Sequence, residues 1–421
     1  MRGALVSDLG LAPEVWLFLS LLGCVTLFFK FSRIWSVRNL DLLLLFVLVP
    51  GMMLIVGDQS HLPWSAFVWL FLGSLLWLIR CLLDLGLSRR PLLEPNLNAP
   101  GLLCLSIGIL VLLLAETVSL PVHDGAARNP AEPAGRKDRP TAEAAADKAQ
   151  DTAVKQVIEP FLPPSLKREP SQVILSRVLA LLAHSGLVTG LVLIGWKHFE
   201  RPITGLSMAA CYLVLPYTRM AVVDSGQLIS AALIILAVFW HSRPSLSGAL
   251  IGLAAGWIPA CVGLIALWAG FYRGRGMYRF LTDACSVAVV CALLGVSIPG
   301  LGRWASALGA RSIAEAGLLP WFEPKSTGSF WAGIDTAYRL PVLIAYVALI
   351  VVTTIWPLRK SVSELIALSA ALLVASQFWY LDKGGALVLL YLPLALLLMF
   401  RPTMAARRSV ATPLQPATTK I

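Results

Sequence analysis

The stretch from Leu246 to Tyr272 reads LSGALIGLAAGWIPACVGLIALWAGFY, and it decides how the chain can pass through a membrane. It carries no charge, yet both of its flanks are basic, with Arg243 before it and Arg273 after it. Basic loops favour the cytoplasmic side, so a single crossing would place one flank on the opposite side. Gly256 and Pro259 interrupt the helix near the centre. We therefore expect two half-height helices that dip in and return; one long, kinked span is the alternative.

The composition indicates an integral membrane protein. Hydrophobic residues make up 57% of the chain and charged residues only 14%, whereas soluble proteins usually carry about 25% charged residues. The apolar residues form blocks close to the roughly 20 residues that a helix needs to cross a bilayer core of about 30 Å. Since lipid offers no partners for the backbone, each block should be a helix. The sequence predicts an all-α polytopic protein with about 11 transmembrane helices plus the half-height hairpin.

The short basic loops between these blocks predict the orientation of the chain. They place the N-terminus outside and the C-terminus in the cytoplasm of a multi-pass protein of the cell (inner) membrane. No small-residue cleavage site follows the first block, so we expect this block to be retained. The expected spans are Glu14–Phe31, Leu40–Val56, Trp64–Leu85, Pro100–Leu120, Gln172–Trp196, Ile203–Val223, Gln227–Trp240, Phe280–Pro299, Tyr338–Trp356, Val362–Tyr380 and Ala386–Phe400.

Three parts follow along the chain. Residues 1–99 are expected to form an N-terminal three-span segment, residues 100–401 a multi-span core, and residues 402–421 a cytoplasmic tail. The core carries outer loops at 121–171 and 300–337. The first loop contains the run NPAEPAGRKDRPTAEAAADKAQD, which lacks hydrophobic periodicity, so we expect this loop to be partly disordered.

Charge, cysteine and histidine usage exclude several classes of partner. The formal net charge of +11 comes from Lys and Arg in short loops, and no basic stripe alternates with aromatic residues, so nucleic acid is not an expected partner. The seven cysteines lie in or beside apolar blocks without CxxC spacing and are interpreted as small buried hydrophobic residues. The five histidines are scattered, so no metal cluster is expected.

Ionisable residues within the apolar blocks are candidates for function because their burial is costly. Arg80 and Asp84 are spaced i and i+4 and are expected to form an ion pair within one helix. Glu116 lies near the end of its block, where it is expected to reach water. His184 is expected to be a hydrogen-bonded packing residue, with a catalytic role as the alternative.

The face predicted to lie outside gathers carboxylates and arginines at the ends of several spans. A carboxylate beside arginines could act as a base next to an anion clamp, since guanidinium binds phosphate oxygens in pairs. Ordinary interfacial residues are the alternative. The set is Asp124, Arg177, Arg219, Asp224, Gln227, Asp335 and Arg339.

The order of motifs within Ser176–Phe280 carries a family resemblance. It comprises Val223-Asp224-Ser225-Gly226-Gln227 at the start of a span, Arg243-Pro244, LSGALIGLAA at 246–255, Pro259, and RGRGMYR at 273–279. This segment resembles GT-C-type polyprenyl-phosphate-sugar-dependent glycosyltransferases, and most closely glycosyltransferase family 87. The resemblance implies a GT-C-like fold for residues 100–401, with a short helical pair beneath the active site.

The resemblance also implies roles for the outer residues. The essential carboxylate of such enzymes lies in the first outer loop of the core, and Asp124 is the nearest match, with Asp58 as second choice. Asp124 would deprotonate the acceptor hydroxyl. The donor would be a polyprenyl-phosphate sugar that enters from the bilayer, without a further cofactor, and the metal requirement is open. Arg177, Arg219 or Arg339 would neutralise the departing phosphate, and Asp224, Gln227 and Asp335 would line the substrate site.

Two departures from the family pattern leave other functions open. Ile229 stands where the family usually has Asn, and Ile258 stands where it usually has Lys. Another cation must then meet the lipid phosphate, or the activity has been lost. A transporter or lipid-handling protein without catalysis is the alternative, because broken helices often line substrate sites. A transporter predicts polar groups near the membrane midplane, where the sequence offers His184 and Gln377; a scaffold without a ligand site is a third possibility.

Overall fold

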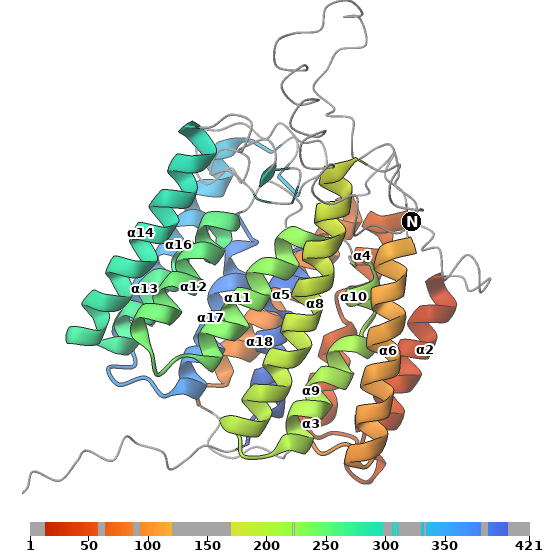
Figure 1. Cartoon of the computed structure of the whole chain (residues 1–421). Helices are drawn as coiled ribbons and strands as arrows, with labels where there is room; N and C mark the ends of the chain where they lie inside the picture. Colours follow the sequence, from red (N-terminus) through yellow and green to blue (C-terminus); the bar gives the residue numbers. More distant parts are fainter. Residues whose placement is uncertain are drawn as a thin grey trace, which may run out of the picture.

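A computed structural model gives the fold of this chain. It describes residues 13–57, 64–86, 93–119, 170–220, 222, 224–297, 305–306, 308, 310, 330–331, 334–379 and 386–402. Every regular element within these ranges is helical, which confirms the predicted all-α class (Figure 1). The α-helices are α2 (Pro13–Phe28), α3 (Val37–Phe46), α4 (Val49–Gly57), α5 (Trp64–Leu83), α6 (Ala99–Ser119), α8 (Ser171–Lys197), α9 (Pro202–Val214), α10 (Pro216–Met220), α11 (Ser225–Phe239), α12 (Pro244–Trp257), α13 (Val262–Tyr272), α14 (Arg275–Ser297), α16 (Leu340–Ile355), α17 (Val362–Ser376) and α18 (Val388–Phe400).

Six helical segments in the described part of the chain are long and apolar enough to cross a membrane. They are Val37–Ile55, Trp64–Leu83, Ala99–Val118, Ser171–Lys197, Arg275–Leu294 and Ala337–Ile355. Other apolar helices are shorter, with 10–17 residues: Glu14–Phe28, Pro202–Val214, Ser225–Phe239, Pro259–Tyr272, Val362–Ser376 and Val388–Phe400. The chain is thus a helical protein of membrane type, and the larger number of crossings stays a prediction.

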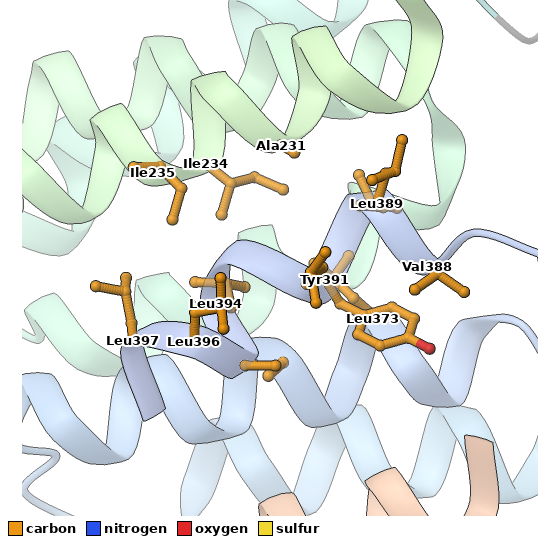
Figure 2. Close-up of a cluster of buried hydrophobic side chains, with 14 of the residues drawn as sticks. Ala231, Ile234, Ile235, Leu373, Val388, Leu389, Tyr391, Leu394, Leu396 and Leu397 are labelled. Carbon is orange, nitrogen blue, oxygen red and sulfur yellow. The ribbon is translucent and has the colours of Figure 1, made fainter. Parts of the chain in front are cut away.

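Helix α18 lies in the centre of the bundle. All of its residues from Val388 to Phe400 are buried, as expected of a helix that is apolar on every side. It packs against α9, α11 and α17. Figure 2 shows Ile234 and Ile235 of α11 facing the α18 side chains Leu394 and Leu397. Residues from α3, α4 and α5 belong to the same hydrophobic core, so the N-terminal segment packs with the rest of the bundle.

The outermost helices expose their apolar side chains. Leu293 on α14 is 57% exposed and Ile344 on α16 is 67% exposed, and α6 carries similar residues such as Val111. A soluble protein rarely leaves extended apolar surface uncovered. These faces therefore suit contact with lipid.

The block from Leu246 to Tyr272 turns back on itself. Helix α12 ends at Trp257, and Ile258 has extended backbone angles (φ −129°, ψ 114°) that end the helix before Pro259. The Tyr272 hydroxyl, at the end of α13, donates a 2.7 Å hydrogen bond to the carbonyl of His241, just before α12 begins. The two basic flanks therefore lie together, as their charge predicts, and the alternative of one kinked span is wrong.

Small residues let α12 approach α14 closely. Gly248, Gly252 and Gly256 repeat every four residues on one face of α12. A Cβ at Gly248 would lie 2.5 Å from the carbonyl oxygen of Phe280, and one at Gly252 would collide with the carbonyl of Ala284. Such small-xxx-small patterns allow helix backbones to touch where lipid gives no hydrophobic drive to association.

A network of buried charges joins the N-terminal helices to the end of α18. Arg80 forms the predicted ion pair with Asp84, 2.9 Å between Nη1 and Oδ1. Its Nε and Nη2 also bind both oxygens of Asp41, the latter at 2.7 Å. The second oxygen of Asp84 accepts a short hydrogen bond from Arg401. The pair predicted from sequence is therefore confirmed, but as part of a larger network that connects α3, α5 and the residue after α18.

Candidate functional site

The bundle has two ends, named here for residues that lie at them. At the Gln227 end, α8 and α11 begin and α6 ends; this is the upper end in Figure 1. At the Arg243 end, α8 and α11 end and α12 begins. The candidate site residues that the structure describes, Arg177, Arg219, Asp224, Gln227, Asp335 and Arg339, lie at the Gln227 end.

Asp224 and Gln227 form a capping turn at the start of α11. The carboxylate of Asp224 accepts hydrogen bonds from the backbone N–H of Gln227 at 3.3 Å and from its side-chain Nε2 at 2.9 Å. Asp is favoured at this position because it satisfies a free N–H and the positive end of the helix dipole. Gln227 Nε2 also donates to the carbonyl of Ala386 at 3.3 Å. The turn thus ties the start of α11 to the segment before α18.

Arg219 is bound to Glu116 of α6 rather than to Asp224. Its Nε lies 2.8 Å from Glu116 Oε2, and its Nη2 lies 3.0 Å from Oε1. Its guanidinium carbon lies 4.1 Å from the ring centroid of Trp16 in α2. Glu116 is only 4% exposed, so the expectation that it reaches water is wrong. A buried carboxylate needs a partner, and the bidentate arginine supplies it.

Arg177 holds the same end of α6. Its Nη1 donates a 2.7 Å hydrogen bond to the carbonyl of Val118. This carbonyl is one of the last four of α6, which lack partners within the helix. A cation at a helix C-terminus is also favoured by the helix dipole. Arg177 and Arg219 therefore both contact the last turn of α6, one through the carbonyl of Val118 and the other through Glu116.

Asp335 and Arg339 lie beside the connection between α17 and α18. Asp335 accepts a 2.9 Å hydrogen bond from the N–H of Ala337 and caps the short 3-10 helix Thr336–Arg339. Arg339 is buried and donates from Nη2 to the carbonyl of Trp379 at 2.8 Å. Gln377 accepts from the N–H of Leu387 at 3.0 Å, which closes the same connection.

The predicted residues thus form two groups at one end of the bundle. One group joins Arg177 and Arg219 to the end of α6. The other joins Gln227 and Arg339 to the segment between α17 and α18. Asp124 and Asp58, the first and second choices for the catalytic carboxylate, lie outside the residues that the structure describes.

His184 has the packing role expected of it. It is fully buried, with Nδ1 3.0 Å from the Tyr212 hydroxyl and Nε2 3.2 Å from the carbonyl of Val222. Both ring nitrogens are therefore engaged within the protein. This contact draws the segment before α11 against the interior of α8.

The sequence predicts no site built from metal ligands or cysteines. In the described part of the chain, no group of three or more His, Cys, Asp or Glu residues could hold a metal ion. All seven cysteines are free thiols. Cys104 and Cys285 are exposed, so the expectation that every cysteine is buried is wrong. They lie on α6 and α14, whose outward faces are apolar.

Sequence reasoning missed the partners Glu116 and Trp16. Glu116 is an acid within an apolar helix, a signal that can mark a buried partner, but it was expected to reach water. Arg219 lies 103 residues further on, and nothing local links the two.

Comparison with protein-family models, with curated proteins and with solved structures finds no match to this chain. The function is therefore inferred from the residues of the chain itself.

Proposed function

We propose that this chain is a GT-C-like membrane glycosyltransferase, which transfers a sugar from a polyprenyl-phosphate donor to an acceptor at the Gln227 end. In this proposal the chain crosses the cell (inner) membrane about eleven times. The Gln227 end and the N-terminus face outward, and the Arg243 end and the C-terminus face the cytoplasm.

The observation that carries the proposal is the hairpin formed by α12 and α13. The resemblance implies a short helical pair at this place in the chain, and the hydrogen bond from Tyr272 to His241 brings the two ends of the pair together. The Gly-Gln turn of the resemblance precedes it, and there Asp224 caps α11 through Gln227. The order of these two elements supports a GT-C-like arrangement.

Arg219 is the arginine best prepared to bind the donor phosphate. Glu116 holds the Nε and Nη2 edge of its guanidinium, and Trp16 lies against its face. The Nη1 group has no hydrogen-bond partner among the described residues. A guanidinium fixed on one edge can present its other N–H groups to a phosphate oxygen with little loss of freedom. Arg177 lies at the same helix end and adds positive charge there.

Asp124 is the proposed base. It follows α6 by a few residues in the chain, and the last turn of α6 contacts both Arg177 and Arg219. A carboxylate near that point would remove the proton from the acceptor hydroxyl as the hydroxyl attacks the anomeric carbon. The polyprenyl phosphate leaves with the bonding electrons, and arginine neutralises its charge.

The test uses the full chain in lipid vesicles and a radiolabelled polyprenyl-phosphate sugar. Asp124→Asn should lower sugar transfer by about 10² to 10⁴-fold, the usual contribution of a general base. Asp283→Asn is the matched control, since Asp283 lies on α14 away from the Gln227 end, and it should retain transfer. Unchanged transfer by Asp124→Asn overturns the assignment of the base.

A second candidate function is lipid handling without bond chemistry. It is favoured by the state of three described carboxylates at the Gln227 end. Glu116 is paired with Arg219, and Asp224 and Asp335 each cap a helix. Retention of polyprenyl phosphate by the purified protein, without sugar transfer from any lipid donor, would support this candidate over the first.

A further inference from the structure

The geometry points to an anionic phospholipid site at the Arg243 end, where the turn between α8 and α9 packs on the turn between α11 and α12. We name it the Lys197–Arg243 site and define it by Lys197, Arg201, Trp240 and Arg243. It lies at the opposite end of the bundle from the proposed transfer site and does not depend on it.

The two turns are held together by buried and half-buried contacts. His198 in the first turn lies 2.9 Å, through Nε2, from the carbonyl of Phe239 at the end of α11. Its ring packs on that of His241 with 4.8 Å between centroids. Tyr272 donates to the His241 carbonyl at 2.7 Å and fixes the second turn from the side of α13. The site is therefore a fixed surface built from two turns distant in sequence.

Two exposed cations share one indole ring. The ammonium of Lys197 lies 5.6 Å from the ring centroid of Trp240 and 5.1 Å from that of Phe239. The guanidinium carbon of Arg243 lies 4.8 Å from the same Trp240 ring. Neither cation forms an ion pair with a carboxylate in the described part of the chain. Stacking on an aromatic face orients a cation without neutralising it, so both charges are positioned for an anion.

The positive charge of the two turns exceeds the negative charge of the one acid within them, Glu200. Glu200 is exposed in the first turn, and Arg201 follows it directly. Counting Lys197 and Arg243 as well, the two turns keep an excess of positive charge. Two cations fixed beside one ring bind a phosphate more strongly than dispersed surface lysines, since the ligand meets them together.

Two helices begin at the same place without side-chain caps. Arg201 is the N-cap of α9 and Arg243 is the N-cap of α12, and neither residue caps its helix with a side-chain hydrogen bond. Both helices begin with proline, which has no N–H, and the N–H of Thr204 is bonded to the carbonyl of Arg201. What the two helix starts add to the exposed cations is therefore the positive end of each helix dipole, which favours an anion.

The surroundings favour a lipid as the source of that phosphate. Lys197 ends a helix long enough to cross a membrane, and Trp196 beside it is 64% exposed. Tryptophan and lysine at the end of a membrane helix lie at the depth of the lipid headgroups. Leu182, nearer the middle of α8, is also 64% exposed, so acyl chains can lie against this helix. The ligand of the Lys197–Arg243 site is a phospholipid with a net negative headgroup in the leaflet at the Arg243 end.

The experiment measures lipids retained by the full purified chain with native mass spectrometry, after exchange with phosphatidylglycerol or phosphatidylcholine. Wild type should retain phosphatidylglycerol in preference. The double variant Lys197→Gln and Arg243→Gln should bind it about 30-fold more weakly, since each cation near a membrane surface contributes about a factor of five.

The matched control removes two exposed arginines from the start of α14 at the same end, with Arg275→Gln and Arg279→Gln. It changes the net charge equally and should lose little affinity. An equal loss in both double variants would mean attraction by general charge alone and would overturn the site.

Two further measurements test the role of the ring and the identity of the anion. Trp240→Leu keeps both cations but removes the ring that orients them, and it should weaken phosphatidylglycerol retention while unfolding in phosphatidylcholine stays unchanged. Inorganic phosphate at millimolar concentration should not displace the lipid. Displacement by inorganic phosphate would assign the site to a free anion and overturn the lipid assignment.

Discussion

The phenol of Tyr272 and the backbone carbonyl of His241 are joined by a 2.7 Å hydrogen bond. This contact brings the last residue of α13 beside the turn that precedes α12, although 31 residues separate the two in the chain. The hairpin they close puts Arg243 and Arg273 at one end of the bundle, with consequences that can be measured in a membrane.

Cysteine labelling should place both flanks of the hairpin on the same side. In a background where the exposed Cys104 and Cys285 are replaced by Ser, Arg243→Cys and Arg275→Cys should react with a membrane-impermeant maleimide from the same side of sealed vesicles. The reason is that α12 and α13 return to their starting end. Reaction from opposite sides would show that the block crosses the membrane once.

Gly252→Ala should destabilise the packing of α12 on α14. The new Cβ would collide with the carbonyl of Ala284, which is backbone and cannot move aside alone. Overpacking of this kind costs about 1–3 kcal/mol. Gly108→Ala in α6 is the control, because its Cβ would meet nothing within 4 Å. Thermal unfolding in detergent should show a lower midpoint for the first variant and an equal or higher one for the second.

Arg80→Gln should be among the most destabilising single changes at the Arg243 end. It leaves Asp41 and Asp84 without the guanidinium that binds both carboxylates. Removal of one partner from a buried ion pair costs about 3–5 kcal/mol. Arg279→Gln, an exposed arginine at the same end, should unfold like wild type.

A double-mutant cycle separates the pair from general effects of the substitution. If Arg80 acts through Asp41, then Arg80→Gln combined with Asp41→Asn should cost less than the sum of the single variants. Additive losses in the unfolding free energy would contradict a direct coupling between the two residues.

Two histidines should make stability depend on pH. Burial lowers the pKa of His198 and of His241 from the ordinary value of 6.5, and the hydrogen bond of each ring to a backbone carbonyl offsets part of this shift. The unfolded chain then binds protons more readily than the folded chain. Their contribution is therefore full above pH 6.5 and falls as the pH drops below it towards the lowered pKa values.

The measurement is the thermal unfolding midpoint between pH 8 and pH 5. The midpoint should fall in the acid part of this range for wild type. His198→Gln combined with His241→Gln should flatten that fall, while a control change at the exposed Arg275 should leave it. An unchanged slope in the histidine variant would assign the acid sensitivity to other groups.

Local sequence features predicted the hairpin and the turn that opens α11, but neither the cap that Asp224 forms in that turn nor the pairing between helices. Pro259 lies just after the end of α12, and Asp224 caps the helix that follows it, so both effects act within a few residues. Pairing between helices depends instead on how each helix is rotated about its axis. Helix α8 is apolar almost all round, so its sequence does not fix which face turns inward.

The contacts of the candidate site also depend on how the helices pair. The sequence placed Arg177 and Arg219 at one face of the membrane, but it could not name the last turn of α6 as the place where both bind. Every residue has a backbone carbonyl, so a sequence does not indicate that the carbonyl of Val118 accepts the hydrogen bond from Arg177. The sequence shows that Glu116 is an acid in an apolar segment, but only the packing of the helices shows that Arg219 is its partner.

The contact between Asp84 and Arg401 also constrains the order of biosynthesis. The helix that carries Asp84 leaves the ribosome more than three hundred residues before Arg401 does. During this interval the early helices must wait in the bilayer with one of their carboxylates lacking its final arginine. Arg401, at the end of α18, therefore completes a network that begins in α3 and α5, and a chain that stops before Arg401 would leave Asp84 without this arginine.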